Sequence, residues 1–179
     1  MSYSHIFVDL SDANNKYVRQ IKDMWITDTK CDDIELYIYK QKNITQYHKC
    51  FCIVDDIDNV AGFLITIEYH SDVHTNKTNP NIEDDMPNIF VKSFVLISEL
   101  LIGEHHRRKG LASALFEKVR ETYGVDVSMR LTVSITNYPA ITLYQKQGFD
   151  IFGFAREYYN RTLYVGDGIH AYIMTRVIT

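Results

Sequence analysis

Apolar positions in the first quarter of the chain change spacing twice. Residues 4–9 predict a short strand, and Ser11 is placed to cap a helix that follows it. The apolar stripe of this helix recurs every three or four residues, at Tyr17, Ile21, Met24 and Trp25. Residues 33–42 predict a second short helix. The chain is therefore expected to begin with one strand and two helices.

The next segment has the composition of paired strands. Residues 50–55 and 60–70 are rich in β-branched and aromatic side chains, and the polar residues 56–59 favour a turn between them, so we expect a hairpin. Residues 71–88 are polar, contain two prolines and show no apolar period, which predicts a long loop. Such a loop is either a solvated insertion or the border of a substrate site.

The second half of the chain alternates strands and helices. A nearly continuous apolar run over 90–102 predicts a strand buried on both faces. Apolar residues then return at helical spacing until Gly124, at Ala112, Leu115, Phe116, Val119 and Tyr123. Residues 129–135 predict the next strand, and residues 137–147 predict a helix that ends at Gly148.

Two further strands, over 149–159 and 168–178, are predicted at the end of the chain. The order of elements mixes α and β without an internal repeat. With 179 residues, of which 46% are apolar, the chain is long enough to bury one substantial core. We therefore predict an α/β fold, of the mixed α+β kind, in a single domain over residues 1–179.

Charge and hydropathy exclude several classes of function. The 19 basic and 23 acidic residues leave a formal net charge of -4, too weak a bias to attract nucleic acid or a membrane surface to the whole molecule. No stretch reaches the roughly 18 apolar residues of a membrane span, and the N-terminus lacks the pattern of a secretion signal. We predict a cytoplasmic protein with neither a nucleic acid nor a membrane as partner. Any anion site must be local.

Metal-binding side chains are present in the sequence but not grouped. Cys50 and Cys52 fall on one face of a predicted strand, which favours core packing, and an odd total of three cysteines suits a reducing compartment. His105 and His106 are adjacent, so they point apart on an extended segment, and no spaced partner completes a ligand set. We therefore predict no metal site.

Candidate chemistry first gathers in residues 105–113, between a predicted strand and a predicted helix. The backbone N–H groups and the positive end of the helix favour an anion at this place. The charged and the small residues of the segment are Arg107, Arg108, Lys109, Gly110 and Ala112. An incidental basic cluster at the start of a surface helix would explain the same residues. The glycine patterns of nucleoside triphosphate and dinucleotide sites are lacking, which disfavours both ligands.

A second candidate lies in residues 137–149. On a helix, Asn137, Ala140, Ile141 and Tyr144 share one stripe. The amide of Asn137 and the phenol of Tyr144 are therefore expected to point the same way. A tyrosine on a helix is more often a core residue than a catalyst, so packing is the alternative for Tyr144.

Together, the two segments resemble the GCN5-related N-acetyltransferase (GNAT) superfamily. The cofactor motif of that family is Arg or Gln, two residues, Gly, one residue, then Gly or Ala, and it reads here Arg107-Arg-Lys-Gly110-Leu-Ala112. The later pattern of the family, Asn, two residues, Ala, a Leu-Tyr pair and Gly-Phe, is met at Asn137, Ala140, Leu143, Tyr144, Gly148 and Phe149. Outside residues 94–149 the resemblance rests on the order of strands and helices.

The resemblance implies a central mixed, mostly antiparallel sheet of seven strands, splayed between the fourth and fifth strands and flanked by about four helices. Acetyl-CoA would be the cosubstrate, and its pantetheine arm would pair with backbone groups of Leu100, Leu101 and Ile102. The pyrophosphate would rest on the segment of Arg107, Arg108, Lys109, Gly110, Leu111, Ala112 and Ser113. Asn137 and Tyr144 would also contact the cofactor.

The acceptor amine must lose a proton before it attacks the thioester. Glu99 is the candidate base, because it stands in an apolar run that could raise its pKa. A carboxylate that faces solvent or pairs with a neighbour is the alternative. A backbone N–H near Leu101 would stabilise the oxyanion, and Tyr144 would protonate the leaving thiolate. The resemblance thus implies a direct attack in a ternary complex.

The acceptor itself is open at this stage. The end of the chain loosely resembles protein N-terminal acetyltransferases of the ribosomal-protein alanine and Ard1 types, which implies that Tyr158 or Tyr159 holds a peptide backbone; an aromatic packing pair is the alternative. The long loop over 71–88 departs from those families, and its acidic residues 83–85 would suit a cationic small amine. Three functions remain: acetylation of protein N-termini, acetylation of a small amine such as a polyamine, an amino acid or an antibiotic, and a silent acetyl-CoA-binding module. A homodimer also stays open.

Overall fold

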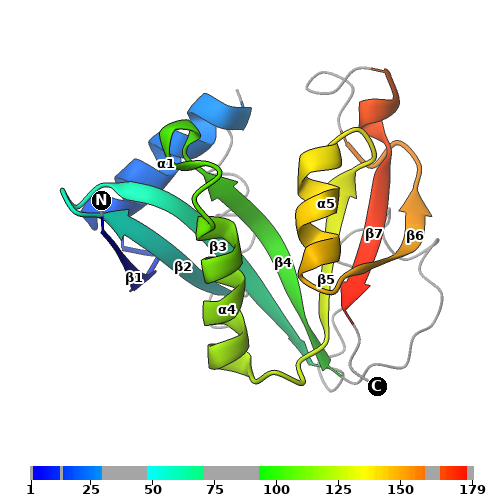
Figure 1. Ribbon diagram of the computed structural model, residues 1–179, viewed down its shortest axis with the longest axis horizontal. Helices are drawn as coiled ribbons and strands as arrows, with labels where there is room; N and C mark the ends of the chain where they lie inside the picture. Colours follow the sequence, from blue (N-terminus) through cyan, green and yellow to red (C-terminus); the bar gives the residue numbers. More distant parts are fainter. Residues whose placement is uncertain (1, 13, 30–47, 71–92, 160–165, 177–179) are drawn as a thin grey trace. The chain divides into compact units, whose positions relative to one another are not determined.

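Seven strands and three α-helices are described in the computed structural model (Figure 1), which covers residues 2–12, 14–29, 48–70, 93–159 and 166–176. The strands are β1 (Tyr3–Val8), β2 (His48–Asp55), β3 (Val60–His70), β4 (Ser93–Ile102), β5 (Met129–Ser134), β6 (Asp150–Ala155) and β7 (Ala171–Arg176). The α-helices are α1 (Lys16–Thr29), α4 (Leu111–Tyr123) and α5 (Tyr138–Lys146), and 3-10 turns cover Glu104–His106 and Gly166–Ile169.

The strands form one mixed sheet in the order β1-β2-β3-β4-β5-β7-β6. The pairs β1–β2, β2–β3, β5–β7 and β6–β7 are antiparallel. β4 and β5 are parallel, paired through Val95–Met129 and Leu96–Arg130. The predicted seven-stranded mixed α/β fold is therefore confirmed. The structure adds that the fourth and fifth strands are the parallel pair.

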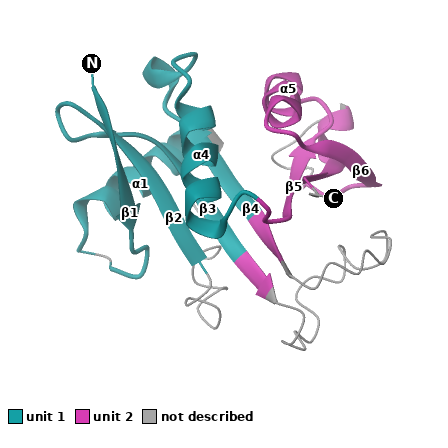
Figure 2. Ribbon diagram, turned by 60° about the horizontal axis from the view of Figure 1, so that its bottom comes forward, with its two compact units in different colours: residues 1–67, 97–125 teal, residues 68–96, 126–179 magenta. Residues whose placement is uncertain are grey.

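The chain divides into two compact units (Figure 2). Unit 1 comprises residues 1–67 and 97–125, and unit 2 comprises residues 68–96 and 126–179. Strand β4 runs from unit 2 into unit 1, so the turn after β4 belongs to unit 1. The prediction of a single domain stays a prediction.

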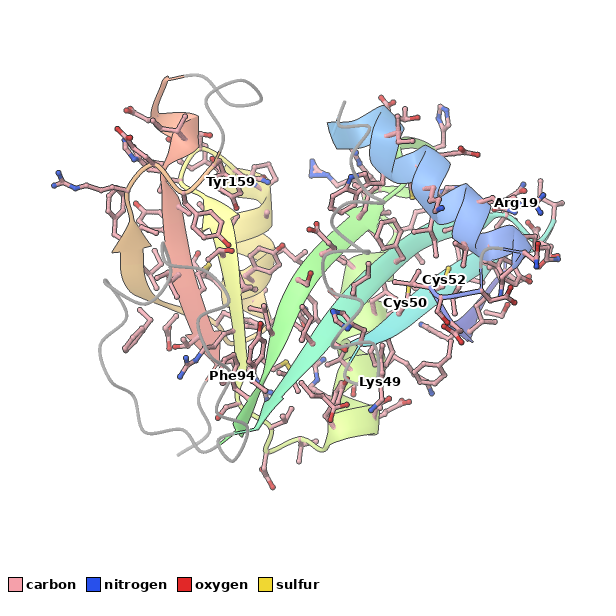
Figure 3. The ribbon with its side chains drawn as sticks, turned by 180° about the vertical axis from the view of Figure 1, so that it is seen from behind. Arg19, Lys49, Cys50, Cys52, Phe94 and Tyr159 are labelled. Atoms are coloured by element: carbon pink, nitrogen blue, oxygen red, sulfur yellow. The ribbon has the colours of Figure 1, made fainter. Side chains whose placement is uncertain are left out.

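Helices α1 and α4 pack on opposite faces of β2 in unit 1. On one face, Cys50 and Cys52 are buried in a cluster with Val18 and Ile21 of α1 (Figure 3). On the other face, the ring of Phe51 lies 6.2 Å from that of Tyr123 at the end of α4. Alternate residues of a strand point to opposite faces, which produces this division. The predicted helical stripe of α1 is confirmed, as is the shared face of the two cysteines.

The start of α1 differs from the prediction. Ser11 does not cap the helix, because its backbone N and its hydroxyl both donate to Asp9 Oδ1, at 2.9 and 2.7 Å. The helix begins at Lys16, after Asn15, whose carbonyl accepts from Val18 N and whose side chain accepts from Tyr17 N. A local turn therefore satisfies Ser11, and asparagine takes the terminal position, where its short amide serves equally well.

In unit 2, helix α5 lies over β5 on one side of the strands (Figure 1), and Ile141 is its buried residue. The last two strands are shorter than predicted. β6 stops at Ala155, and Glu157 just beyond it has a φ of 51°, outside the range of a strand. β7 begins only at Ala171, because the preceding residues form a 3-10 turn.

Several predictions fall on residues that lie outside the described ranges. These are the second helix over 33–42, the loop over 71–88 with its acidic residues, and the start of the strand predicted from residue 90. About four helices were expected, and the described ranges contain three α-helices. In that part of the chain, no helix is long and apolar enough to cross a membrane.

Candidate active site

The turn between β4 and α4 carries the predicted anion site, and all of it belongs to unit 1. The chain leaves β4 at Gly103, passes through the 3-10 turn, and enters α4 at Leu111. Within this turn Arg108 has a φ of 63° and Gly110 a φ of 78°. Left-handed residues in a turn direct backbone N–H groups toward a common point, which is the geometry of an anion-binding concavity. A non-glycine residue in this region is uncommon, so Arg108 marks a specialised turn.

The first turn of α4 supplies donors to the same place. The first hydrogen bond of the helix runs from Ala114 N to Gly110 O at 3.1 Å. The amides of Leu111 and Ala112 come before this bond, so the helix itself offers them no acceptor. Gly110 makes no side-chain cap. The dipole of α4 adds partial positive charge, and the basic residues Arg107, Arg108 and Lys109 are exposed there. The turn therefore combines backbone donors, a helix N-terminus and three cations, which suits a pyrophosphate.

Arg107 is also a structural residue. Its Nε donates to the carbonyl oxygen of Ile102 at 3.0 Å, which ties the turn back to the end of β4. This brings together two predicted cofactor-binding residues, and it occupies one backbone acceptor that we expected to face the pantetheine arm. Leu100 and Leu101, the other predicted backbone contacts, are partly buried.

Gly62 of β3 was missed by the sequence analysis. A Cβ at this position would lie 2.4 Å from Ile102 Cδ1 and 2.9 Å from the carbonyl oxygen of Leu101, so no larger residue fits without moving β4. One residue away, Gly103 N donates to Ala61 O at 2.9 Å. The position of the predicted cofactor strand is thus set by a close backbone approach, and a glycine within a strand is the one available signal for it.

Glu99 lies on β4 in unit 1 and is partly exposed. In a regular strand it shares a face with Leu101, which packs against the α1 cluster. Burial raises the pKa of the Glu99 carboxyl to about 8, because the ionised form loses hydration. Among the described residues, none offers this carboxylate a hydrogen bond or a cation. A carboxyl group with a pKa near neutrality can take up and release a proton under ordinary conditions.

The later predicted residues belong to unit 2. Asn137 is the N-cap of α5: its Oδ1 accepts from Ala140 N at 3.3 Å, so the amide is folded over the first turn. Tyr144 is partly buried, and its ring lies 6.1 Å from that of Phe149 in an edge-to-face contact. Both the predicted helix and its end at Gly148, with a φ of 86°, are confirmed. Asn137 therefore has a structural task, whatever it contacts besides.

Tyr158 and Tyr159 form an edge-to-face pair with ring centroids 4.9 Å apart, and both pack against a small cluster of β6 and β7 in unit 2. The hydroxyl of Thr132 on β5 donates to Tyr158 Oη at 3.2 Å. Since Thr132 stands opposite Ile173 in the β5–β7 register, these side chains share one face of the sheet. The pair is thus anchored by packing and by one hydrogen bond, as the packing alternative predicts.

Further aromatic residues of unit 2 escaped the sequence analysis. The ring of Phe94, labelled in Figure 3, is stacked on that of Tyr69, with centroids 4.9 Å apart and planes 5° apart. Arg130 Cζ lies 4.1 Å from the centroid of the Phe94 ring, in a cation–π contact. Burial raises the pKa of Tyr69, and nearby Tyr158 adds to the shift. Tyr69, Phe94 and Arg130 come from three successive strands, so no local sequence pattern reveals this stack.

Cys50 and Cys52, the two cysteines of the described ranges, are buried in the core of unit 1. Burial raises the pKa of the Cys52 thiol to about 12 and raises that of Cys50 as well, so neither thiol ionises readily. No group of three potential metal ligands occurs in the part of the chain that the structure describes.

Comparisons with known proteins agree with this geometry. A model of the acetyltransferase (GNAT) family matches residues 17–149. An N-alpha-acetyltransferase of Saccharolobus solfataricus is 28% identical over 144 residues, which cover 78% of this chain and 76% of that protein. The L-amino acid N-acetyltransferase AaaT of Escherichia coli is 34% identical over 90 residues, 48% of this chain and 53% of that protein. The crystal structure of Arabidopsis thaliana NAA60 in complex with a bisubstrate analogue has a TM-score of 0.71 at 19% identity, over 99% of this chain and 100% of that chain, and shows a shared fold.

Proposed function

Because the chain belongs to the acetyltransferase (GNAT) family, and is thus an acetyl-CoA-dependent N-acetyltransferase, we propose that its acceptor is the α-amine at the N-terminus of a polypeptide. The similarity to the archaeal N-alpha-acetyltransferase supports this acceptor class, since it extends over 78% of the chain. The observation that carries the proposal is the place of Glu99 on β4, just before the anion turn, in surroundings that raise the pKa of its carboxyl.

The pKa of Glu99 matches one class of amine better than another. The α-ammonium group of a peptide has a pKa of about 7.7–8.0, whereas a lysine-type ammonium has one of about 10.4. Moving a proton from the α-ammonium group to a carboxylate with a pKa of about 8 changes the free energy very little. Moving it from the lysine-type ammonium to the same carboxylate costs roughly 3 kcal/mol. A base with this pKa therefore favours α-amines over polyamines and lysine side chains.

The turn of unit 1 supplies the binding site for the cosubstrate in this proposal. The pyrophosphate of acetyl-CoA is held by the amides of Leu111 and Ala112 and by the cations of the turn. The pantetheine arm pairs with backbone groups of Leu100 and Leu101, next to the close approach of Gly62. Asn137 completes the contacts from the start of α5.

The chemical step is a direct transfer. Glu99 accepts a proton from the α-ammonium group, and the neutral nitrogen attacks the thioester carbonyl. The oxyanion that forms is stabilised by a backbone N–H near Leu101. The attacking nitrogen gives its second proton to water as the C–S bond breaks, Tyr144 gives its phenolic proton to the departing thiolate, and the neutral amide product and coenzyme A leave. Proton exchange with water restores both side chains.

The tyrosine pair of unit 2 is the proposed contact for the peptide backbone. Tyr158 and Tyr159 are held by packing and by Thr132, so their rings offer a preformed surface rather than one ordered on binding. The second candidate acceptor is a free amino acid, which the similarity to the Escherichia coli enzyme favours. Both candidates present an α-amine.

A thiol-release assay with acetyl-CoA tests the proposal. The acceptors are short peptides with free N-termini, the same peptides with blocked N-termini and one internal lysine, free amino acids, and spermidine. We expect turnover with free N-termini, and none with blocked peptides or spermidine. Turnover restricted to free amino acids would establish the second candidate, and turnover with spermidine alone would refute an α-amine acceptor.

A further inference from the structure

Four side chains around the anion turn are linked in a chain, and the proposed function uses Lys109 but none of the other three. Lys109 Nζ donates to Tyr3 Oη at 3.3 Å, Tyr3 Oη lies 3.1 Å from His106 Nδ1, and His106 Nε2 lies 4.0 Å from Asp55 Oδ2. All four residues belong to unit 1. They connect the first strand of the fold to the turn after β4.

The sheet register places two of these residues side by side. Tyr3 of β1 stands opposite Asp55 of β2, so both side chains emerge on the same face of the sheet. His106, at the end of the 3-10 turn, packs edge-to-face on the Tyr3 ring with centroids 5.8 Å apart. The imidazole is 16% exposed and the Asp55 side chain 5% exposed, so the inner part of this chain is shielded from water.

The chemistry of the groups fixes the direction of the hydrogen bond between Lys109 and Tyr3. An ammonium group can only donate, so the oxygen of Tyr3 accepts from Lys109. The Tyr3 oxygen keeps a second lone pair and its own proton, so the hydrogen bond with His106 Nδ1 runs in the direction that the tautomer of the imidazole sets. His106 Nε2 faces Asp55 Oδ2 at 4.0 Å, which is beyond the distance of a direct hydrogen bond. Asp55 is itself fixed, because its Oδ1 accepts from Ile57 N and Asn59 N.

We propose that Asp55, His106 and Tyr3 form a positioning relay that holds Lys109 where its ammonium pairs with the pyrophosphate of acetyl-CoA. The relay rests on the proposed function, because it gives a task to a residue of the cofactor turn. Its members are positioning residues: they act on cofactor affinity through Lys109 and take no part in acetyl transfer. A flexible lysine loses side-chain entropy when it binds a phosphate, and a hydrogen bond that holds the ammonium beforehand reduces that loss.

Calorimetric titration of coenzyme A into the full chain tests the relay. Tyr3→Phe removes the hydroxyl and keeps the ring, so we expect the Kd for coenzyme A to rise between about two- and tenfold, the range for one hydrogen bond. Lys109→Met should raise it at least as much. In the double variant, Tyr3→Phe should add no further loss, because the lysine it positions is already absent.

Three controls separate positioning from general stability. Tyr17→Phe removes another tyrosine hydroxyl of unit 1, one that donates to Asp58 at 2.5 Å, and should leave the Kd unchanged. His106→Asn keeps an amide that can donate or accept near the Nδ1 position and should retain most of the affinity, whereas His106→Ala should resemble Tyr3→Phe. At saturating acetyl-CoA, kcat of Tyr3→Phe should equal that of the parent while KM rises.

The outcomes divide cleanly. The relay would be overturned if the two increases in Kd multiplied in the double variant. It would also be overturned if Tyr17→Phe raised the Kd as much as Tyr3→Phe does. With 3′-dephospho-coenzyme A, which keeps the pyrophosphate, the Tyr3→Phe loss should persist; a loss seen only with coenzyme A would overturn the pyrophosphate assignment. Failure of the parent chain to bind coenzyme A would refute the proposed function and the relay with it.

Discussion

Replacement of Glu99 by glutamine should make the protein more stable and less active. In the folded chain this carboxyl keeps its proton to a pH of about 8, whereas its ordinary value is 4.5. Between these two values the folded state binds more protons than the unfolded state, so the free energy of unfolding falls as the pH rises through that interval and is level above it. The ionised carboxylate is thus a source of instability that glutamine lacks.

The magnitude follows from the shift. The difference between 4.5 and about 8 corresponds to an upper limit of about 5 kcal/mol. Because Glu99 is partly exposed, water relieves some of that cost, and we expect Glu99→Gln to be more stable than the parent by roughly 2–4 kcal/mol at pH 9. At pH 5 both side chains are neutral in the folded state, so the two proteins should differ by less than about 1 kcal/mol.

Urea unfolding of the parent and of Glu99→Gln, at several values between pH 5 and pH 9, measures the effect. Glu117→Gln is the matched control, since it removes an exposed carboxylate of the same unit and should show no comparable gain at high pH. Unfolding is measured without an acceptor amine. The pH dependence of stability therefore reports the titration of Glu99 and not that of the substrate. Equal curves for the parent and Glu99→Gln across the interval would refute the raised pKa.

Activity gives the second half of this prediction. If Glu99 is the base, the parent rate should rise with pH toward a plateau above pH 8, and Glu99→Gln should lose on the order of a hundredfold in acetyl transfer with nearly unchanged affinity for acetyl-CoA. A stabilised variant that keeps full turnover would leave the pKa intact and remove the catalytic role, with the proton leaving through water or another residue.

Three further substitutions test other parts of the site. Tyr144→Phe keeps the ring contact with Phe149, so the melting temperature and acetyl-CoA affinity should change little while the transfer rate falls by about tenfold or more; a variant as active as the parent would show that the thiolate needs no proton from Tyr144. Gly110→Leu should cost about 1–2 kcal/mol of stability because φ is 78°, and should also weaken coenzyme A binding in calorimetry, although a Cβ there meets no protein atom within 4 Å; unchanged affinity would place the phosphates elsewhere. Gly62→Ala should lower both the urea midpoint and acetyl-CoA affinity, since its Cβ would displace the carbonyl of Leu101; a loss of stability with intact affinity would separate that carbonyl from the cofactor.

The periodic elements were predictable because their signals are local. Helix α4 ends at Gly124, and β2 and β3 form the expected hairpin around the turn 56–59. Apolar residues at fixed spacing determine which face is buried, and glycine determines where a helix can stop. The motif of residues 107–112 likewise lies in consecutive residues, so the sequence alone located the proposed cofactor turn.

Element ends were less predictable, because several short polar residues can satisfy the same backbone groups. Ser11 and Asn15 are both good helix caps, and only the hydrogen bonds of Ser11 to Asp9 show which one the chain uses. The same holds for the ends of β6 and β7, where a positive φ at Glu157 and a 3-10 turn replace residues that the strand pattern would accept.

The sequence by itself determined the strands, the helices, the motif turn and the identity of the acidic and phenolic candidates. Tertiary structure decided the rest: that Gly62 approaches Leu101, and that His106 lies against Tyr3, 103 positions away in the chain. It also decided that Glu99 is desolvated strongly enough to raise its pKa to about 8. A residue's chemistry is set by its type, but its protonation and its partners depend on side chains brought near by strand register and packing, and those neighbours are distant in sequence.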